Sequence, residues 1–132
     1  MSSRGSIIKY GFVTTNDYST LFVTSTGAKV LVGIGNNHSL PELSHSPNSI
    51  YVKLKNDNKT LHEVRFFDEN CNPIIEIGYH PEPNLNNKNR ENNILHFHTY
   101  KGLVRDKTVI MNDEIFNKYK FVLKEFNIYG SK

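Results

Sequence analysis

The chain has 132 residues, of which 37% are hydrophobic and 22% charged, and its formal net charge is +3. This length fits one domain, 1–132, and the apolar fraction is sufficient for a packed core. No run approaches the roughly 18 consecutive apolar residues of a membrane span, and no apolar stretch typical of a signal peptide follows the first residues. We therefore expect no membrane partner. The mild positive charge permits a polyanionic partner without identifying one.

The single cysteine excludes an intrachain disulfide and favours a reducing, cytoplasmic compartment. Cys71 lies among turn-forming residues, between Asp68 and Pro73, and not beside a base. A tolerated turn residue is therefore a better interpretation than a nucleophile. The sequence Gly33-Ile34-Gly35 lacks a third glycine and a following helix, so it does not indicate dinucleotide binding.

Most of the chain shows runs of β-branched and aromatic residues separated by turn-forming residues. These runs predict strands at 6–13, 20–24, 28–34, 50–55, 61–67, 74–79 and 94–100. The polar segment 36–49, with two prolines, is expected to be a loop. Strands that are close in sequence and joined by tight turns pair antiparallel, and we expect the series to end at Tyr100.

The last segment has the spacing of an amphipathic helix. The apolar positions are Ile115, Tyr119, Val122, Leu123 and Phe126. Asn112 or Asp113 can cap the helix start and Asn127 can end it. The predicted fold class is therefore α+β: a curved antiparallel sheet with a C-terminal amphipathic helix over one face.

The strand at 94–100 carries the most distinctive polar pattern. Side chains alternate along a strand, so His96, His98 and Tyr100 share one face. Leu95 and Phe97 lie on the other face and are expected to belong to the core. Two imidazoles and a phenol are then neighbours on the face away from the core. A solvated strand face would show the same pattern.

The preceding strand adds a third imidazole. His80 lies at its end, on the same face as Glu76 and Gly78. If the two strands are neighbours, His80 lies near the other imidazoles, Glu76 can reach a ring nitrogen, and Gly78 leaves space for a ligand.

The two strands are connected by a long loop, Pro81 to Asn93, that contains two basic residues. Long loops without secondary structure are often functional. Lys88 and Arg90 place positive charge next to the histidines, although solvated loop charges are also common. Imidazoles that move protons beside cations that hold an anion suit a phosphate-bearing substrate.

Several of these residues form a pattern that resembles a known group of protein domains. The run from Val64 to Ile77, then His80-Pro81 and His96-Phe97-His98, resembles C-terminal toxin domains of bacterial polymorphic toxins. It is most similar to phage-associated nuclease domains of the barnase, EndoU, colicin and RelE type. Their usual turn contains a glycine where this chain has Cys71-Asn72. The resemblance implies a metal-independent ribonuclease with histidines on an antiparallel sheet, and an immunity or antitoxin protein as a partner. Such a toxin can also be delivered into a target cell.

The leading hypothesis is an endoribonuclease without metal or cofactor. A general base takes the proton of the ribose 2′-hydroxyl, and a general acid protonates the leaving oxygen. We expect His80 and one of His96 and His98 to form the acid–base pair, with Tyr100 positioning the substrate. The phosphate would be bound by Arg65, Lys88 or Arg90.

Two alternatives remain open from the sequence. The three histidines, with Glu76 or Glu82, are a possible ligand set for a divalent metal in a hydrolase. In the second alternative, the chain is a phage-derived module that binds nucleic acid or a protein without catalysis.

Overall fold

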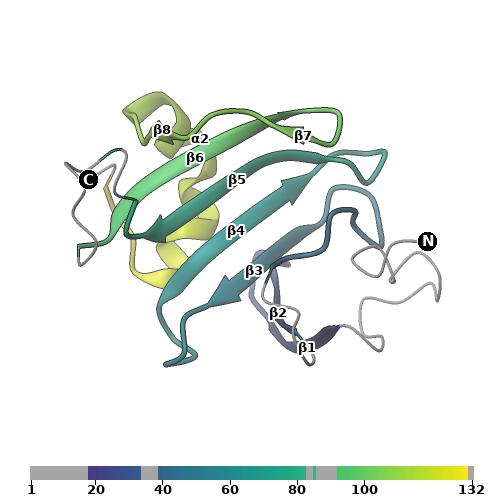
Figure 1. Cartoon of the computed structure of the whole chain (residues 1–132). Coiled ribbons are helices and arrows are strands. Elements are labelled where there is room, and N and C mark those ends of the chain that lie inside the picture. Colours follow the sequence, from purple (N-terminus) through teal and green to yellow (C-terminus); the bar gives the residue numbers. More distant parts are fainter. Residues whose placement is uncertain (1–17, 34–38, 83–84, 86–91, 131–132) are drawn as a thin grey trace.

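The computed structural model describes residues 18–33, 39–82, 85 and 92–130 (Figure 1). The strand expected at 6–13 and the cations Lys88 and Arg90 lie outside these residues.

The described strands form one sheet in the order β1-β2-β3-β4-β5-β6-β7, and β8 also pairs with β6. Their bounds are β1 Tyr18–Val23, β2 Lys29–Gly33, β3 Ile50–Leu54, β4 Leu61–Phe67, β5 Pro73–His80, β6 Ile94–Lys101, β7 Val104–Arg105 and β8 Val109–Ile110. Helix α2 spans Asp113–Leu123 and is followed by the 3₁₀ helix η2, Lys124–Phe126. The predicted α+β class, with a mostly antiparallel sheet and a C-terminal helix, is confirmed.

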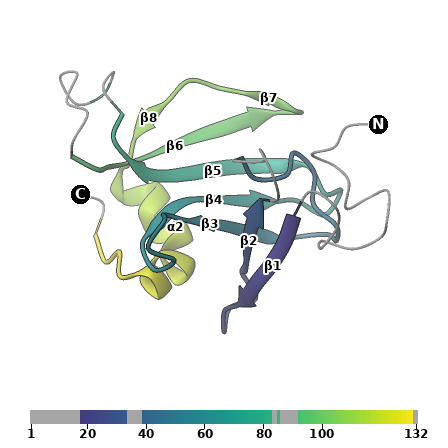
Figure 2. The same cartoon turned by 60° about the horizontal axis from the view of Figure 1, so that its bottom comes forward.

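One strand pair differs from the expected antiparallel arrangement. β2 and β3 are parallel, with Lys29 opposite Tyr51 and Val30 opposite Val52. The rule for tight turns does not apply here, because a long connection joins these two strands and lets the chain cross over. Figure 2 shows the hairpin of β1 and β2 running across the direction of β3 to β6.

The strand series does not end at Tyr100 as predicted. After a turn at Gly102, which has a positive φ of 62°, the chain runs back along β6. β7 pairs with the end of β6, and β8 pairs with its middle, where Ile110 lies opposite His96. Only four residues of this returning segment are in strands. Such short strands give no clear period-2 pattern in the sequence, which is why they were not predicted.

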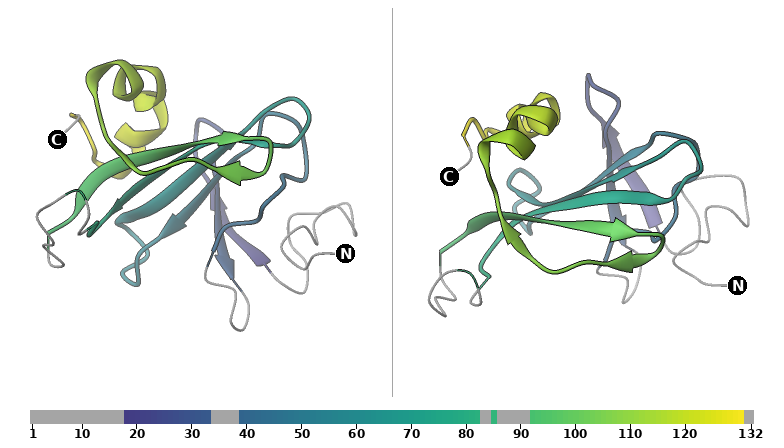
Figure 3. Two further views of the ribbon diagram at one scale, coloured as in Figure 1. Left: turned by 45° about the horizontal axis from the view of Figure 1, so that its top comes forward. Right: turned by 90° about the horizontal axis from the view of Figure 1, so that it is seen from above.

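Helix α2 covers one face of the sheet, as the views in Figure 3 show. Tyr119 packs on Phe66 with ring centroids 4.5 Å apart, and Leu95 and Phe97 are buried in the same core. Asn112 caps the helix, because its side chain accepts a hydrogen bond from the Ile115 N–H at 2.8 Å. No helix among the described residues is long and apolar enough to cross a bilayer.

The expected end of the helical segment is also confirmed. Asn127 ends η2 in the left-handed conformation, with φ 65°. Glu125, within η2, reaches the turn between β1 and β2. Its carboxylate accepts hydrogen bonds from the hydroxyls of Ser25 and Thr26.

The opposite face of the sheet is partly covered by the segment 39–49. A second, small apolar cluster lies there and contains Leu31, Leu40, Tyr51 and Phe67. The Tyr51 hydroxyl accepts a hydrogen bond from the His45 N–H at 2.7 Å, which ties the segment to the sheet. The rest of this face is left open beside the cluster.

The turn between β4 and β5 contains Cys71 at the position where the resemblance to toxin domains predicts a glycine. Cys71 has φ 66°, a left-handed conformation that glycine adopts without cost. Asp68 holds the turn, since its Oδ1 accepts from the N–H groups of Asn70 and Asn72 at 2.8 and 3.0 Å. Cys71 therefore occupies a position that favours glycine. Its half-buried free thiol is consistent with a turn residue.

Candidate functional site

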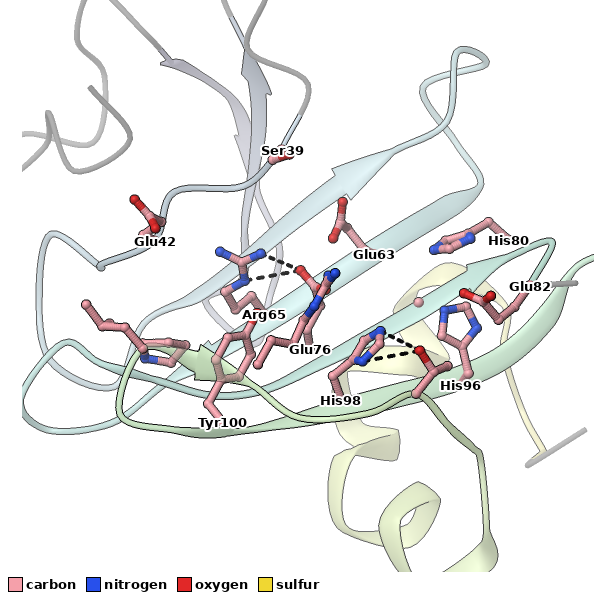
Figure 4. A pocket seen from close by; sticks show the side chains of 15 residues that line it. Ser39, Glu42, Glu63, Arg65, Glu76, His80, Glu82, His96, His98 and Tyr100 are labelled. Carbon is pink, nitrogen blue, oxygen red and sulfur yellow. Dashed lines mark hydrogen bonds and ion pairs between the residues drawn. The ribbon is translucent and has the colours of Figure 1, made fainter. Parts of the chain in front are cut away.

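A polar cavity of about 470 Å³ lies on the face of the sheet opposite α2 (Figure 4). Cross-strand register builds it from two rows of side chains. Glu63, Gly78 and His96 are partners in one row. Arg65, Glu76 and His98 are partners in the next row. The complete lining is Ser39, Glu42, Glu63, Arg65, Pro73, Glu76, Gly78, His80, Glu82, His96, His98, Tyr100, Leu103, Arg105 and Thr108.

The structure brings His80 and His96 together above Gly78. Their rings meet edge to face, with centroids 4.6 Å apart. A Cβ atom on Gly78 would lie 2.7 Å from His96 Nε2 and 2.9 Å from His80 Nε2. Gly78 was expected to leave space for a ligand, and it does line the cavity, but two imidazoles occupy the space next to its Cα. The missing side chain makes room for the two imidazoles, and the ligand space lies beyond them.

Backbone carbonyls orient all three predicted histidines. His80 Nδ1 lies 3.1 Å from the carbonyl oxygen of Pro81, and His96 Nδ1 lies 2.8 Å from that of Ile94. His98 Nδ1 lies 3.0 Å from the carbonyl oxygen of Asp106. A carbonyl only accepts, so each Nδ1 carries the hydrogen and each Nε2 of a neutral ring keeps its lone pair. Such a nitrogen can accept a proton or a hydrogen bond.

The histidine face is drier than the sequence indicated. His96 is 1% exposed and His98 is 9% exposed, so neither belongs to a solvated strand face. Both nevertheless lie outside the apolar core, as predicted, because they line the cavity. Burial lowers the pKa of His96, and the nearby His80 adds to this effect. His96 is therefore a neutral base over a wider pH range than an exposed histidine.

His62 is a fourth imidazole of this group, although its place in the sequence suggested a structural or surface residue. Its ring stacks on that of His80, with centroids 4.6 Å apart and planes 22° from parallel. The register of β3 and β4 shifts at this point, from Lys53 opposite Glu63 to Leu54 opposite Leu61, and skips His62. Strict alternation fails at such an irregularity, which explains the error. Burial, followed by the charges of His80 and Lys53, lowers the pKa of His62 to about 4.

Glu76 does not reach a histidine ring, contrary to expectation. Its carboxylate lies between two guanidinium groups: Oε2 accepts from Arg65, and Oε1 accepts from Arg105 Nη1 at 3.2 Å. Burial alone would raise the pKa of Glu76. A hydrogen bond with Glu63 and the charges of both arginines outweigh burial and lower the pKa to about 2. Glu76 is therefore an ionised anchor and not an acid–base group near neutral pH.

Arg65 lines the cavity, but most of its donors are occupied. The side chain is 7% exposed. Nε and Nη2 donate to Glu76, and Nη1 donates to the carbonyl oxygens of Leu40 and Pro41. These bonds hold the segment 39–49 on the sheet. Arg65 also lies 5.8 Å from the ring centroid of Tyr100, which places Tyr100 at the same end of the cavity.

Glu63 was not identified from the sequence. It lies between the arginine end and the histidine end of the cavity (Figure 4). Burial, followed by the hydrogen bond with ionised Glu76, raises its pKa to about 8. At neutral pH the carboxyl group of Glu63 therefore carries a proton. An isolated Glu within a strand gives no sequence signal for this, because the pKa shift depends on burial and on the partner Glu76 from β5.

Among the described residues, no group of three or more His, Cys, Asp or Glu side chains is arranged to hold a metal ion. The sequence matches no protein-family model and no curated protein, and the fold matches no solved structure. The resemblance of residues 62–100 to toxin nucleases therefore stays a prediction.

Proposed function

We propose that this protein is a metal-independent endoribonuclease that cleaves RNA by attack of the 2′-hydroxyl on the adjacent phosphate. One observation carries the proposal: the Nε2 atoms of His80 and His96 lie next to each other over Gly78, 2.9 and 2.7 Å from the position that a Cβ atom of this residue would occupy. Their Nδ1 atoms are held by carbonyl oxygens, so the two Nε2 atoms are kept close together in the lining of the cavity. Two converging proton-transfer groups are what transesterification requires.

In the proposed reaction, one imidazole Nε2 takes the proton from the 2′-hydroxyl. The 2′-oxygen bonds to phosphorus, and the bond from phosphorus to the 5′-oxygen breaks. A protonated group donates to the leaving 5′-oxygen, which yields a 2′,3′-cyclic phosphate and a 5′-hydroxyl. His96 suits the role of base, because burial keeps it neutral. His80 is the adjacent group for the second proton transfer, with His98 and Tyr100 positioning the substrate.

The surroundings of the imidazoles support a polyanionic substrate. The pair of arginines around Glu76 has one positive charge in excess. Lys88 and Arg90 follow His80 in the sequence, and we propose that they bind the RNA backbone. Curvature of the sheet around this face would bring the two ends of the cavity toward one strand of RNA. A cell that makes such a cytoplasmic toxin would need an inhibitory partner protein.

The test is incubation of purified protein with total RNA in the presence of EDTA. We expect cleavage that leaves 2′,3′-cyclic phosphate ends. His80→Ala and His96→Ala should each lower its rate by about 10²-fold or more, whereas His45→Ala, outside the cavity, should behave as wild type.

Two results would contradict the proposal. Cleavage that requires added zinc or manganese would favour a metal-dependent hydrolase. Binding of RNA without cleavage, unchanged in His80→Ala and His96→Ala, would favour a binding module.

A further inference from the structure

The cavity has two arginines, and only one of them is available to a ligand. The bonds of Arg65 to Glu76, Leu40 and Pro41 use both Nη atoms and Nε of a buried side chain. The Arg105 side chain is 55% exposed, and its described contact is a single ion pair, from Nη1 to Glu76 Oε1 at 3.2 Å. Arg105 therefore has unused N–H donors in a guanidinium whose position is partly fixed.

The local charge favours an anion at Arg105. Arg65, Glu76 and Arg105 together carry one net positive charge, because a single carboxylate is shared by two guanidinium groups. The nearby Glu63 is hydrogen-bonded to Glu76 and carries a proton at neutral pH. The cavity has two other carboxylates: Glu42, in the segment 39–49 that partly covers the sheet, and Glu82, which lies beside His96 at the histidine end.

The hairpin of β6 and β7 sets the place of Arg105 relative to the histidines. Arg105 is the cross-strand partner of Tyr100. The next residue, Asp106, supplies the carbonyl oxygen that holds the His98 ring. Arg105 belongs to the row of Tyr100, two rows from Gly78, but its guanidinium reaches back to Glu76 in the intervening row, which also contains His98. An anion bound by the guanidinium is therefore about one row of side chains away from Gly78. Successive rows on one face of a strand are about 7 Å apart.

We propose that Arg105 is the phosphate-binding residue of this cavity and receives the phosphodiester group next to the one that reacts above Gly78. Glu76 tethers one Nη atom, and the remaining N–H groups bind two phosphate oxygens side by side, the geometry in which guanidinium groups bind phosphate. This inference rests on the proposed function for the source of the phosphate, an RNA chain. The affinity of the site for phosphate itself does not depend on cleavage.

The first experiment uses inorganic phosphate as the probe, with binding to the full chain followed by NMR of the arginine Nε–H and histidine ring signals. We expect Arg105→Ala to weaken phosphate binding at least about tenfold. Arg105→Lys should restore part of the affinity, since a lysine keeps the positive charge but lacks the paired N–H donors of a guanidinium. Lys107→Ala is the matched control, an exposed cation two residues away that does not line the cavity. Equal phosphate affinity of wild type and Arg105→Ala, or an equal loss in Lys107→Ala, would overturn the proposal.

The second experiment uses single-stranded RNA. Arg105→Ala should raise KM much more than it lowers kcat, because the residue holds a phosphate that does not react. The slope of log affinity against log salt should decrease by about 0.7, the value for one contact to a single strand. An unchanged KM and salt slope would show that RNA does not use Arg105. If wild type does not cleave RNA at all, the proposed function fails, and the phosphate titration still decides the role of Arg105.

Discussion

Glu63 and His96 lie on opposite sides of Gly78 in one cross-strand row, so they face each other across the only position of that row without a side chain. The gap at Gly78 is filled by the imidazoles of His96 and His80. One glycine thus determines how closely the titratable groups of β4, β5 and β6 can approach.

Replacement of Gly78 by alanine should therefore damage the site more than the fold. The new methyl group would lie 2.7 Å from His96 Nε2 and 2.9 Å from His80 Nε2, closer than van der Waals contact allows. Imidazole rings can rotate away, so we expect a change in Tm of only a few degrees and at least a tenfold loss of RNA cleavage. Thermal unfolding and initial rates measure the two effects. Cleavage at the wild-type rate would show that the convergence of the two rings is not needed.

Removal of the imidazoles themselves should have the largest effect on activity. His80→Ala and His96→Ala should each lower the cleavage rate by about 10²-fold or more, the usual contribution of a positioned acid or base. Since burial lowers the pKa of His96, the acidic limb of the pH–rate profile should lie below 6.5, the ordinary value. A limb at or above 6.5 would argue against His96 as the base.

The carboxyl pair of Glu63 and Glu76 should make stability depend on pH. The pKa of Glu63 is about 8 in the folded chain, above the ordinary value of 4.5. Between these values the folded state retains a proton that the unfolded state has lost, so stability decreases as pH rises through this range. Glu63→Gln should remove this decrease and raise stability at pH 8 by about 1 kcal/mol or more relative to its effect at pH 5. Urea unfolding at the two pH values tests this.

Other charged or titratable groups, on its own strand and on neighbouring strands, share the electrostatic environment of Glu63. They are Lys53 on β3, His62 and Arg65 on β4, Glu76 on β5 and Tyr100 on β6. Glu76 has the opposite effect to Glu63, because its pKa is lowered to about 2 and it adds stability as pH rises from 2 to 4.5. An equal gain in Glu63→Gln at pH 5 and pH 8 would show that Glu63 is not protonated at neutral pH.

Core packing under α2 should be sensitive to Phe97. This residue is 6% exposed and belongs to the main apolar cluster. Phe97→Ala should lower the free energy of unfolding by about 3–5 kcal/mol. Thr99→Ala, on the same strand but exposed, is the control and should change it by about 0.5 kcal/mol or less. Equal effects of both variants would contradict the burial of Phe97 in the core under α2.

Alternation along a strand was enough to predict much of this site. It placed Leu95 and Phe97 in the core and His96 and His98 together on the other face, because the period of 2 is a property of any extended backbone. The helix was equally predictable from the sequence, since the capping residues Asn112 and Asn127 mark its two ends.

The remainder depends on partners that are distant in sequence. His62 joins the histidines only because β4 shifts register against β3. Burial and the neighbouring Glu76 raise the pKa of Glu63, and the position of Arg105 depends on a returning segment with few strand residues. These positions and pKa shifts arise from tertiary contacts, so no local sequence pattern predicts them.

The hydrogen bonds between Glu125 and the turn at Ser25 and Thr26 have a consequence for how the molecule folds. They close a loop of 100 residues between Ser25 and Glu125, and nearly the whole sheet lies within that loop. Loop closure over such a distance has a high entropic cost until the intervening strands are in place. The contact therefore forms late, and the hairpin of β1 and β2 is fastened to the C-terminal helix only after β3 to β6 have assembled. Hydrogen exchange should then report the hairpin and η2 as a single unit that opens first.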